Sequence, residues 1–397
     1  MRLKVFHEGN HIGNLDTTAR KGIEFSYTPD AVAPISISMP DLNRVYSEKE
    51  CLPFFEGLLP EGEIRRQIAE FAHVPATSVM KLLGRYGADI AGALVITDSE
   101  TDSDDSSGYE PLSAGEISRR ISQKSRIPMI VSGERIRLSL AGAENKIPVL
   151  YKDGEFLLPF GKAASSHIIK ATDEFVENEY ICNRLAFHSG LGVPEMEIVE
   201  FEGKQALLIR RFDRTIDSDG TVCRLHQEDF CQALGFMSGN KYEENGGPGL
   251  QASMQLIRNY SDDPVADSGR FNEMAVFNYM IGNCDAHAKN FSMLYDRNLK
   301  RKHLAPFYDV VCSSIYGQFD RSLAMKVGRH RDLDRISASD FEGIASKKLA
   351  YEAMDHLVSV FPTAIEAVGN ELDDHMHPLL VKIVTDAGAR ISRLSAL

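Results

Sequence analysis

The sequence lacks the features that mark several large classes of protein. No run reaches the ~18 apolar residues that a membrane-spanning helix needs. The N-terminus, "MRLKVFHEGN", has no long apolar stretch of the kind found in secretory signals. No CxxC pair occurs among the six cysteines, and their spacing is not that of a disulfide framework. We therefore expect a cytoplasmic protein with no membrane association and with reduced cysteines.

Positive charge is also scarce. Lys and Arg number 44 against 57 Asp and Glu, which gives a formal net charge of −13. This balance argues against a large nucleic-acid-binding face built by this chain alone, and it fits solubility or a basic partner. The group Cys223, His226 and Cys231 suggests a metal cluster, but it lacks a second paired set, so structural thiols are the better interpretation.

Several catalytic motifs are missing. The chain contains no GxSxG, HExxH, GxGxxG or Walker A sequence. A serine hydrolase or a zinc protease is therefore unsupported, because each needs its nucleophile or its metal ligands at those spacings.

What is present is an ordinary globular composition of 397 residues, 43% hydrophobic and 25% charged, which suggests two or three domains. Alternating residues predict strands at the N-terminus and in "ISISMP", and helical periodicity begins in "PFFEGLLPEGEIRRQIAEF". The acidic, Ser-rich stretch "DSETDSDDSSGYEP" reads as a loop or linker. A capping-box pattern, "SAGE", then opens a short helix.

The second part of the chain is first β-rich and then helical. Strands are predicted in "KIPVLYKDGEFLLPFG", "SHIIKAT", "PEMEIVEF" and "KQALLIRRFDR", with "KDGE" as a hairpin turn and one helix in "ENEYICNRLAFHSG". We predict an α+β fold with a small α/β domain at 1–105, a linker and short helix at 106–128, a β-rich lobe at 129–228 and a helical lobe at 229–397.

The stretch "GNCDAHAKNFSM" concentrates polar chemistry directly after an apolar helix. Asp285 and Asn290 have the spacing of the protein-kinase catalytic loop, in which the Asp accepts the substrate proton and the Asn binds a metal. Downstream, "PFYDVV" places Asp309 where a second metal-binding carboxylate is expected. Carboxylate and amide oxygens suit Mg²⁺. His287 is read as a structural residue that orients the loop, with a general base as the alternative.

A kinase also needs residues that hold ATP. Lys170 ends the strand "SHIIK" and is a candidate phosphate ligand, or alternatively a surface residue; Glu177 or Glu179 could pair with it. "LSLAGAENK" has the layout of a phosphate-covering loop, with Ser139 at its start as a possible phosphate acceptor or a plain strand serine. Arg210, Arg211 and Phe212 lie where an adenine is held, although Asp213 between Arg211 and Arg214 can equally form a local ion pair.

Taken together, these segments resemble the HipA family of bacterial toxin kinases. The resemblance rests on eight ordered motifs, "LSLAGAENK", "SHIIK", "ENEY", "RRFDR", "HQEDFCQALG", "KYEENGGPG", "CDAHAKNFS" and "PFYDVV". It is strong from about residue 129 to residue 311, and "ISISMP" with "FFEGLLPEG" resembles the family's small N-terminal domain. Sequence alone assigns no role to "HQEDFCQALG" or "KYEENGGPG".

The resemblance implies a protein-kinase-like bilobal fold and an ATP- and Mg²⁺-dependent serine/threonine protein kinase. It implies the toxin of a type II toxin–antitoxin module that phosphorylates an aminoacyl-tRNA synthetase, notably the glutamyl enzyme, and so causes growth arrest and persistence. The implied partner is a HipB-like helix-turn-helix antitoxin, through which the chain reaches operator DNA as a corepressor.

Carried over by position, the resemblance makes Asp285 the catalytic base, with His287 and Lys289 in the same loop, and Asn290 and Asp309 the metal ligands. Ser139 matches the self-inactivating autophosphorylation site. The implied nucleotide contacts are Ala141, Gly142, Ala143, Glu144, Asn145, Lys146, Lys170, Arg210, Arg211, Phe212, His287, Ala288, Lys289 and Asn290.

Two alternatives stay open at this point. A small-molecule kinase acting on a sugar or a lipid head group would carry the same catalytic residues. A catalytically silent corepressor is the other, although the presence of Lys170, Asp285, Asn290 and Asp309 argues against it. A short helix-turn-helix gene beside this one would favour the toxin, whereas a catabolic operon would favour the small-molecule kinase.

Overall fold

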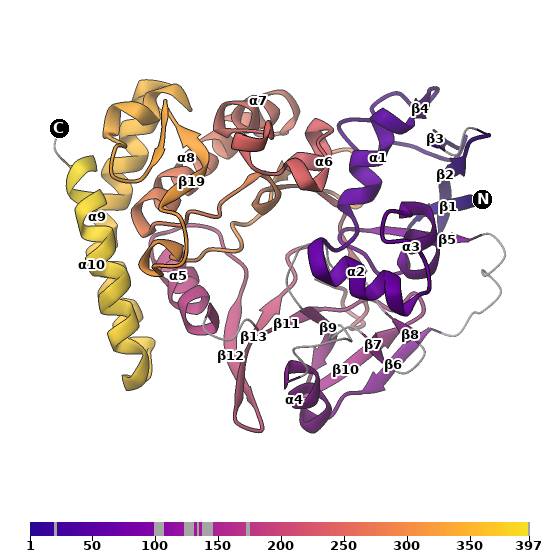
Figure 1. Ribbon diagram of the computed structural model, residues 1–397, viewed down its shortest axis with the longest axis horizontal. Coiled ribbons are helices and arrows are strands. Elements are labelled where there is room, and N and C mark those ends of the chain that lie inside the picture. Colours follow the sequence, from indigo (N-terminus) through magenta and orange to yellow (C-terminus); the bar gives the residue numbers. More distant parts are fainter. Residues whose placement is uncertain are drawn as a thin grey trace. The chain divides into compact units, whose positions relative to one another are not determined.

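The computed structural model describes residues 1–19, 22–98, 107–122, 131–132, 135–136, 146–171 and 175–395. The chain forms two compact units (Figure 1). Unit 1 comprises Met1–Asp173, Glu197–Ser238 and Leu294–Arg301, and unit 2 comprises Glu174–Met196, Gly239–Met293 and Lys302–Leu397. The polypeptide therefore crosses between the units several times, and each unit is built from segments that are distant in sequence.

Unit 1 begins with a five-stranded antiparallel sheet in the order β4-β3-β2-β1-β5. Its strands are β1 (Arg2–His7), β2 (Asn10–Thr17), β3 (Ile23–Tyr27), β4 (Val45–Ser47) and β5 (Leu94–Asp98). The predicted N-terminal hairpin is confirmed, with Gly9 at φ 79° in its turn. Three helices follow β4: α1 (Glu48–Gly57), α2 (Gly62–Phe71) and α3 (Val79–Tyr86). The predicted helix start is confirmed at Glu61, the N-cap of α2.

The strand predicted in "ISISMP" is wrong. Residues 35–40 carry no strand, although Ile35, Ile37 and Met39 are buried as their alternation suggests. The reason is that side chains, and not a neighbouring strand, satisfy this backbone. The Ile35 amide donates to the Tyr27 hydroxyl (3.0 Å), and the Ile37 amide donates to Glu228 (2.9 Å).

A second, six-stranded sheet in unit 1 has the order β12-β13-β11-β9-β10-β6. Its strands are β6 (Gly108–Pro111), β9 (Lys146–Lys152), β10 (Glu155–Phe160), β11 (His167–Lys170), β12 (Met196–Phe201) and β13 (Lys204–Arg210). The predicted "KDGE" turn is confirmed, because Asp153 and Gly154 both have positive φ (52° and 84°), as a tight hairpin requires. Short strands are β7 (Val131–Ser132), β8 (Arg135–Ile136), β14 (Arg214–Ile216), β15 (Val222–Arg224) and β16 (Gln227–Asp229).

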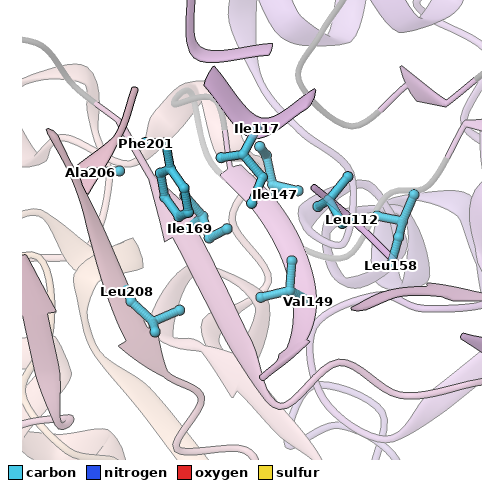
Figure 2. Close-up of a cluster of buried hydrophobic side chains, with 9 residues drawn as sticks. All are labelled: Leu112, Ile117, Ile147, Val149, Leu158, Ile169, Phe201, Ala206 and Leu208. Atoms are coloured by element: carbon cyan, nitrogen blue, oxygen red, sulfur yellow. The ribbon is translucent and has the colours of Figure 1, made fainter. Parts of the chain in front are cut away.

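One face of the six-stranded sheet packs against helix α4 (Ala114–Ser122), and Figure 2 shows the apolar side chains that meet there. Ile117 from α4 belongs to one hydrophobic cluster with Ile147 and Val149 of β9 and Ile169 of β11, all of them inaccessible to solvent. Burying each such side chain contributes roughly 1.5–3 kcal/mol. Of the predicted capping box, one bond is present: the Glu116 amide donates to the Ser113 hydroxyl (3.2 Å), whereas the Glu116 carboxylate pairs with Arg119 and Arg120. Within the segment predicted as a linker and short helix, the described residues 107–122 thus supply an edge strand and a cover for this core.

The "HQEDFCQALG" motif ties segments of unit 1 together. The His226 ring bonds the Ile35 carbonyl (2.7 Å), and Glu228 accepts from the Ser36 hydroxyl (2.6 Å). Gln232, in helix α6 (Phe230–Leu234), donates to the Phe54 carbonyl of α1 (2.8 Å). The motif therefore fastens the N-terminal sheet region through buried polar contacts, a role that its local pattern could not indicate.

Unit 2 is mainly helical, and it includes the helix α5 (Val176–His188), which lies within the predicted β-rich lobe at 129–228. Its other helices are α7 (Leu250–Tyr260), α8 (Pro264–Ile281), α9 (Lys347–Glu371) and α10 (His377–Leu394). Helix α8 packs against α7, α9 and α10, and Figure 1 shows α9 and α10 alongside each other in yellow. Smaller elements are β18 (Lys302–Leu304), β19 (Ser322–Val327) and β20 (His330–Asp332), while β17 (Ser292–Tyr295) has residues in both units. The predicted α+β class is confirmed.

Candidate functional site

The loop that carries Asp285 starts where helix α8 ends. Gly282 caps the helix in the left-handed conformation (φ 71°), and its amide donates to the α8 carbonyls of Asn278 and Tyr279. From Met274 to Met293 every residue is buried except Asp285. A carboxylate that alone reaches solvent from a buried loop is placed to meet a ligand, and the core beneath holds its backbone still.

A short turn explains the spacing of five residues between Asp285 and Asn290. The His287 amide donates to the Asp285 carbonyl (2.8 Å), and the Asn290 amide donates to the His287 carbonyl (2.9 Å). Residues Ala288–Asn290 form one turn of 3₁₀ helix, and the Asn290 side chain accepts from the His287 amide (3.2 Å). The turn therefore returns Asn290 to the side of the loop on which it meets Asp309.

Asn290 and Asp309 lie side by side, since the Asn290 amide donates to the Asp309 carboxylate (3.2 Å). Asp309 has a positive φ of 53°, which is uncommon for a residue other than Gly and is concentrated at functional sites. Its carbonyl accepts from the Asn283 side chain (3.3 Å). The loop before Asp285 thus helps to hold Asp309 in this conformation.

His287 is buried under the loop. Burial, followed by the positive charge of Lys241, lowers the pKa of its imidazole to about 3, so the ring is neutral at physiological pH. Its Nδ1 atom is buried and has no hydrogen-bond partner among the described residues. Lys289 is also buried, at 9% exposure, and its carbonyl accepts from the Tyr308 hydroxyl (2.9 Å). The Nδ1 atom of this neutral ring can therefore form a hydrogen bond with a water or a phosphate oxygen.

The backbone of the loop is braced by the segment after Asp309. The Cys284 amide donates to the Ser313 hydroxyl (2.9 Å), and the Ser314 amide donates to the Gly282 carbonyl (3.1 Å). From α10, Arg390 donates to the Met280 carbonyl at the end of α8 (3.0 Å). These contacts link the two segments that carry Asp285 and Asp309, so their relative position is set by the core of unit 2.

The predicted phosphate-binding lysines lie in unit 1. Strands β9 and β11 are antiparallel, and their register sets Lys146 directly opposite Lys170. Ile147 and Ile169 are also opposed and face the hydrophobic core, so the two lysines project from the other face of the sheet. That face also carries the apolar side chains of Pro148, Ile168 and Leu207. Two lysines on one face of a sheet can contact the same phosphate.

Arg211 is engaged in a buried ion-pair network in unit 1. Its guanidinium donates to Asp213 (2.7 Å) and to the Ser165 hydroxyl (2.9 Å), and Arg214 also pairs with Asp213. Burial opposes ionisation of Asp213, but the two arginines outweigh it and hold the pKa of this carboxyl well below its usual range. The ion pair considered from the sequence is therefore present, whereas Arg210 is exposed and Phe212 is partly exposed.

Several other predicted residues lie outside the described residues or make contacts elsewhere. Ser139 and the loop from Ala141 to Asn145 lie outside the described residues. Of the two acidic candidates on α5, Glu177 pairs with His375 (3.3 Å), whereas Glu179 is buried. Of the considered metal cluster, His226 bonds the Ile35 carbonyl and the Cys223 thiol donates to Asp217 (3.0 Å). Within the described ranges, no group of three His, Cys, Asp or Glu side chains is arranged to hold a metal.

Sequence reasoning missed the part that Tyr242 plays. This residue of the "KYEENGGPG" motif donates its hydroxyl to the Asp285 carboxylate (2.8 Å). One hint was present in the sequence: the motif had no assigned role although it lies between segments that resemble the family. No local pattern predicts a contact across 43 positions.

The residues that would hold Mg²⁺ fit that ion. Asn290 and Asp309 lie side by side through the Asn290 amide nitrogen and the Asp309 carboxylate, while the Asn290 amide oxygen accepts from the His287 backbone. An amide oxygen and a carboxylate are hard ligands of the kind that suits Mg²⁺, which retains several waters. The unused nitrogen of His287 can serve a water of that shell.

The helix-anchored loop thus carries an exposed carboxylate, Asp285, and an amide, Asn290, that is paired with a second carboxylate, Asp309; these are the residue types that the catalytic loop and metal site of a kinase use. The protein-family model described as "HipA-like C-terminal domain" matches residues 138–371, and the model described as "HipA N-terminal domain" matches residues 3–97. The chain belongs to the HipA family. The protein-kinase-like fold expected from the sequence is thereby confirmed.

Similar proteins of other bacteria support the family assignment. A Sinorhizobium fredii protein described as "Putative kinase Y4mE" is 34% identical over 94% of this chain and 92% of its own length. The serine/threonine-protein kinase toxin HipA of Shewanella oneidensis is 32% identical over 77% of this chain and 72% of its own length. A solved complex of Shewanella oneidensis HipA, HipB and operator DNA contains a chain with a TM-score of 0.87 and 28% identity, covering 99% of this chain and 96% of that one. Among the described residues, no helix is both long and apolar enough to cross a membrane.

Proposed function

We propose that this protein is an ATP- and Mg²⁺-dependent serine/threonine protein kinase that acts as the toxin of a HipBA-type toxin–antitoxin module. The observation that carries the proposal is the loop of unit 2, where Asp285 alone is exposed within a buried run and Asn290 contacts Asp309. In this assignment Asp285 accepts the proton of the substrate hydroxyl as that oxygen attacks the γ-phosphate. A bound Mg²⁺ would neutralise charge on the phosphate oxygens.

The nucleotide phosphates are assigned to the lysine face of the six-stranded sheet. Lys146 and Lys170 are opposed there, and Pro148, Ile168 and Leu207 offer apolar contact beside them. A buried cation such as Lys170, at 2% exposure, binds a phosphate more strongly than an exposed one because little solvent screens the interaction. Phosphotransfer depends mainly on such positioning and on charge, so the protein needs no covalent intermediate.

The protein substrate is proposed from the family assignment. We expect an aminoacyl-tRNA synthetase, in the first place the glutamyl enzyme, whose phosphorylation would stop charging and cause growth arrest and persistence. Self-phosphorylation of Ser139 would then inactivate the kinase. We also expect a HipB-like antitoxin to bind this acidic chain and to carry it to operator DNA, as a net charge of −13 makes direct DNA binding unfavourable.

Phosphotransfer is tested by incubating the purified chain with Mg·ATP, followed by intact-mass and peptide mass spectrometry. We expect one added phosphate, on Ser139, and none in Asp285→Asn, because removing a general base slows transfer by ~10²–10⁴-fold. Asp309→Asn should fail as well, while Asp355→Asn, on the exposed side of α9, should behave as wild type. Full phosphate uptake in Asp285→Asn would refute the assignment of the base.

The target and the partner need separate assays. Transfer of the γ-phosphate of labelled ATP to purified glutamyl-tRNA synthetase, with loss of its charging activity, is the expected result. A synthetase that stays unlabelled beside a self-phosphorylating kinase would refute this target and leave the kinase assignment intact. In a mobility-shift assay, the chain should shift operator DNA only together with the antitoxin.

A further inference from the structure

The geometry points to Tyr242 as a positioning residue for the catalytic base: we propose that its hydroxyl holds the Asp285 carboxylate in the orientation and charge state that proton abstraction needs. The inference rests on the proposed function, and it extends it to a residue outside the catalytic loop. It also gives the "KYEENGGPG" motif a role in catalysis.

Tyr242 makes two contacts with one loop. Its hydroxyl donates to Asp285 Oδ1 (2.8 Å), and its ring meets the His287 ring edge-on, with centroids 5.1 Å apart and planes at 81°. Asp285 is exposed, and an exposed carboxylate otherwise exchanges among several rotamers. A hydroxyl donor fixes one of them and stabilises the ionised form, which is the form that accepts a proton.

The position of Tyr242 is itself determined by the chain around it. The amides of Asn245 and Gly247 both donate to the Tyr242 carbonyl (3.0 Å each), which closes a tight turn. A Cβ atom at Gly247 would lie 2.0 Å from the Asn240 carbonyl oxygen and 2.8 Å from that of Tyr242, so only glycine fits there. The glycines of the motif therefore serve the placement of its tyrosine.

The same turn is tied back to the catalytic loop through strand β19. Glu243 accepts from the Lys326 amide (2.6 Å), and the Ala324 amide donates to the Cys284 carbonyl (2.9 Å), one residue before Asp285. Together with the bond from Tyr242 to Asp285, these contacts join the turn at Tyr242, strand β19 and the catalytic loop to one another. Because each of the three segments is bonded to the other two, the phenol has little freedom to move away from the carboxylate.

The test is Tyr242→Phe, which keeps the ring against His287 and removes only the hydroxyl. We expect kcat for phosphorylation to fall about tenfold or more, the loss expected for a hydrogen bond to a charged group, with KM for ATP within about twofold. The acidic limb of the kcat/KM profile should move to higher pH, because loss of the donor raises the pKa of the base. Tyr260→Phe, at an exposed tyrosine on α7, is the matched control and should resemble wild type.

Two further measurements separate the possible outcomes. In an Asp285→Asn background, Tyr242→Phe should cost nothing more, whereas a second tenfold loss would mean that Tyr242 acts elsewhere. Carboxyl ¹³C titration of Asp285 should give a higher midpoint in Tyr242→Phe and needs no turnover. An unchanged kcat and an unchanged acidic limb in an active enzyme would overturn the inference, while a wild-type protein without phosphotransfer would instead refute the proposed function.

Discussion

Lys146 and Lys170 are directly opposed on neighbouring antiparallel strands of unit 1, and both project from the sheet face that lies away from the hydrophobic core. Two cations on one face of a sheet suit a ligand that brings negative charge, as the phosphates of ATP do.

Replacing either lysine should weaken nucleotide binding. We expect Lys146→Met and Lys170→Met each to raise the Kd for ATP about tenfold or more, because each removes a charge-assisted contact to phosphate. The measurements are the ATP-induced rise in Tm and calorimetric titration. Lys152→Met, at the exposed end of the same strand β9, should keep wild-type affinity. Equal affinity in all three variants would show that the phosphates bind elsewhere.

The helix cap before the catalytic loop should tolerate no side chain. At Gly282, φ is 71° and a Cβ atom would lie 2.0 Å from the Ser314 hydroxyl and 2.8 Å from Arg390 Nη2. Gly282→Ala should therefore destabilise the fold by ~1–3 kcal/mol and reduce phosphotransfer, because Ser314 braces the loop. Gly269→Ala, in the same helix with open space around it, should be neutral or stabilising. Denaturant unfolding and phosphate uptake measure the two effects.

The buried carboxylate Asp213 should be required for stability. It pairs with Arg211 and Arg214 and accepts from the Gly92 amide (2.9 Å), all in unit 1. In Asp213→Asn two buried guanidinium groups lose the carboxylate that they share, while Asp89 remains beside Arg214 (3.4 Å). This change should lower the free energy of unfolding by ~3–5 kcal/mol at pH 7. Asp30→Asn, at an exposed position, is the control. A loss below ~1 kcal/mol would mean that water reaches and solvates the arginines.

Glu228 should make stability depend on pH. Burial raises the pKa of its carboxyl from 4.5 to about 7, against the opposing bonds from Ser36, Tyr295 and Ile37, while Asp229 raises it further. Because the folded protein binds this proton more tightly, the contribution is full below pH 4.5 and is lost as the pH rises through 7. The change across that window is ~3 kcal/mol.

Comparison with Glu228→Gln isolates the contribution of this carboxyl to the pH dependence of stability. The amide does not titrate, so the difference in unfolding free energy between wild type and variant should shrink or reverse from pH 5 to pH 8 by a few kcal/mol, about the size of that change. Glu110→Gln, on the exposed edge strand β6, should shift stability equally at both pH values. A wild-type stability that rises over this range relative to Glu228→Gln would contradict the prediction.

Short-range features of the molecule were predictable from sequence because they depend on neighbouring residues. The turn at Asp153 and Gly154 needs only two positive φ angles, and Gly282 ends α8 for the same local reason. The spacing of Asp285 and Asn290 predicted a short loop, and the structure has a turn of 3₁₀ helix there, at Ala288–Asn290. That both side chains serve one site stays a prediction.

Sequence by itself thus determined the local turns, the helix-anchored polar loop and the family resemblance. Tertiary structure alone decided that residues 35–40 form no strand, because Glu228 and His226, about 190 positions away, satisfy their backbone. It also decided that Lys146 faces Lys170 and that Tyr242 holds Asp285. Strand register and side-chain contacts depend on how distant segments pack, and periodicity within one segment carries no information about its partner.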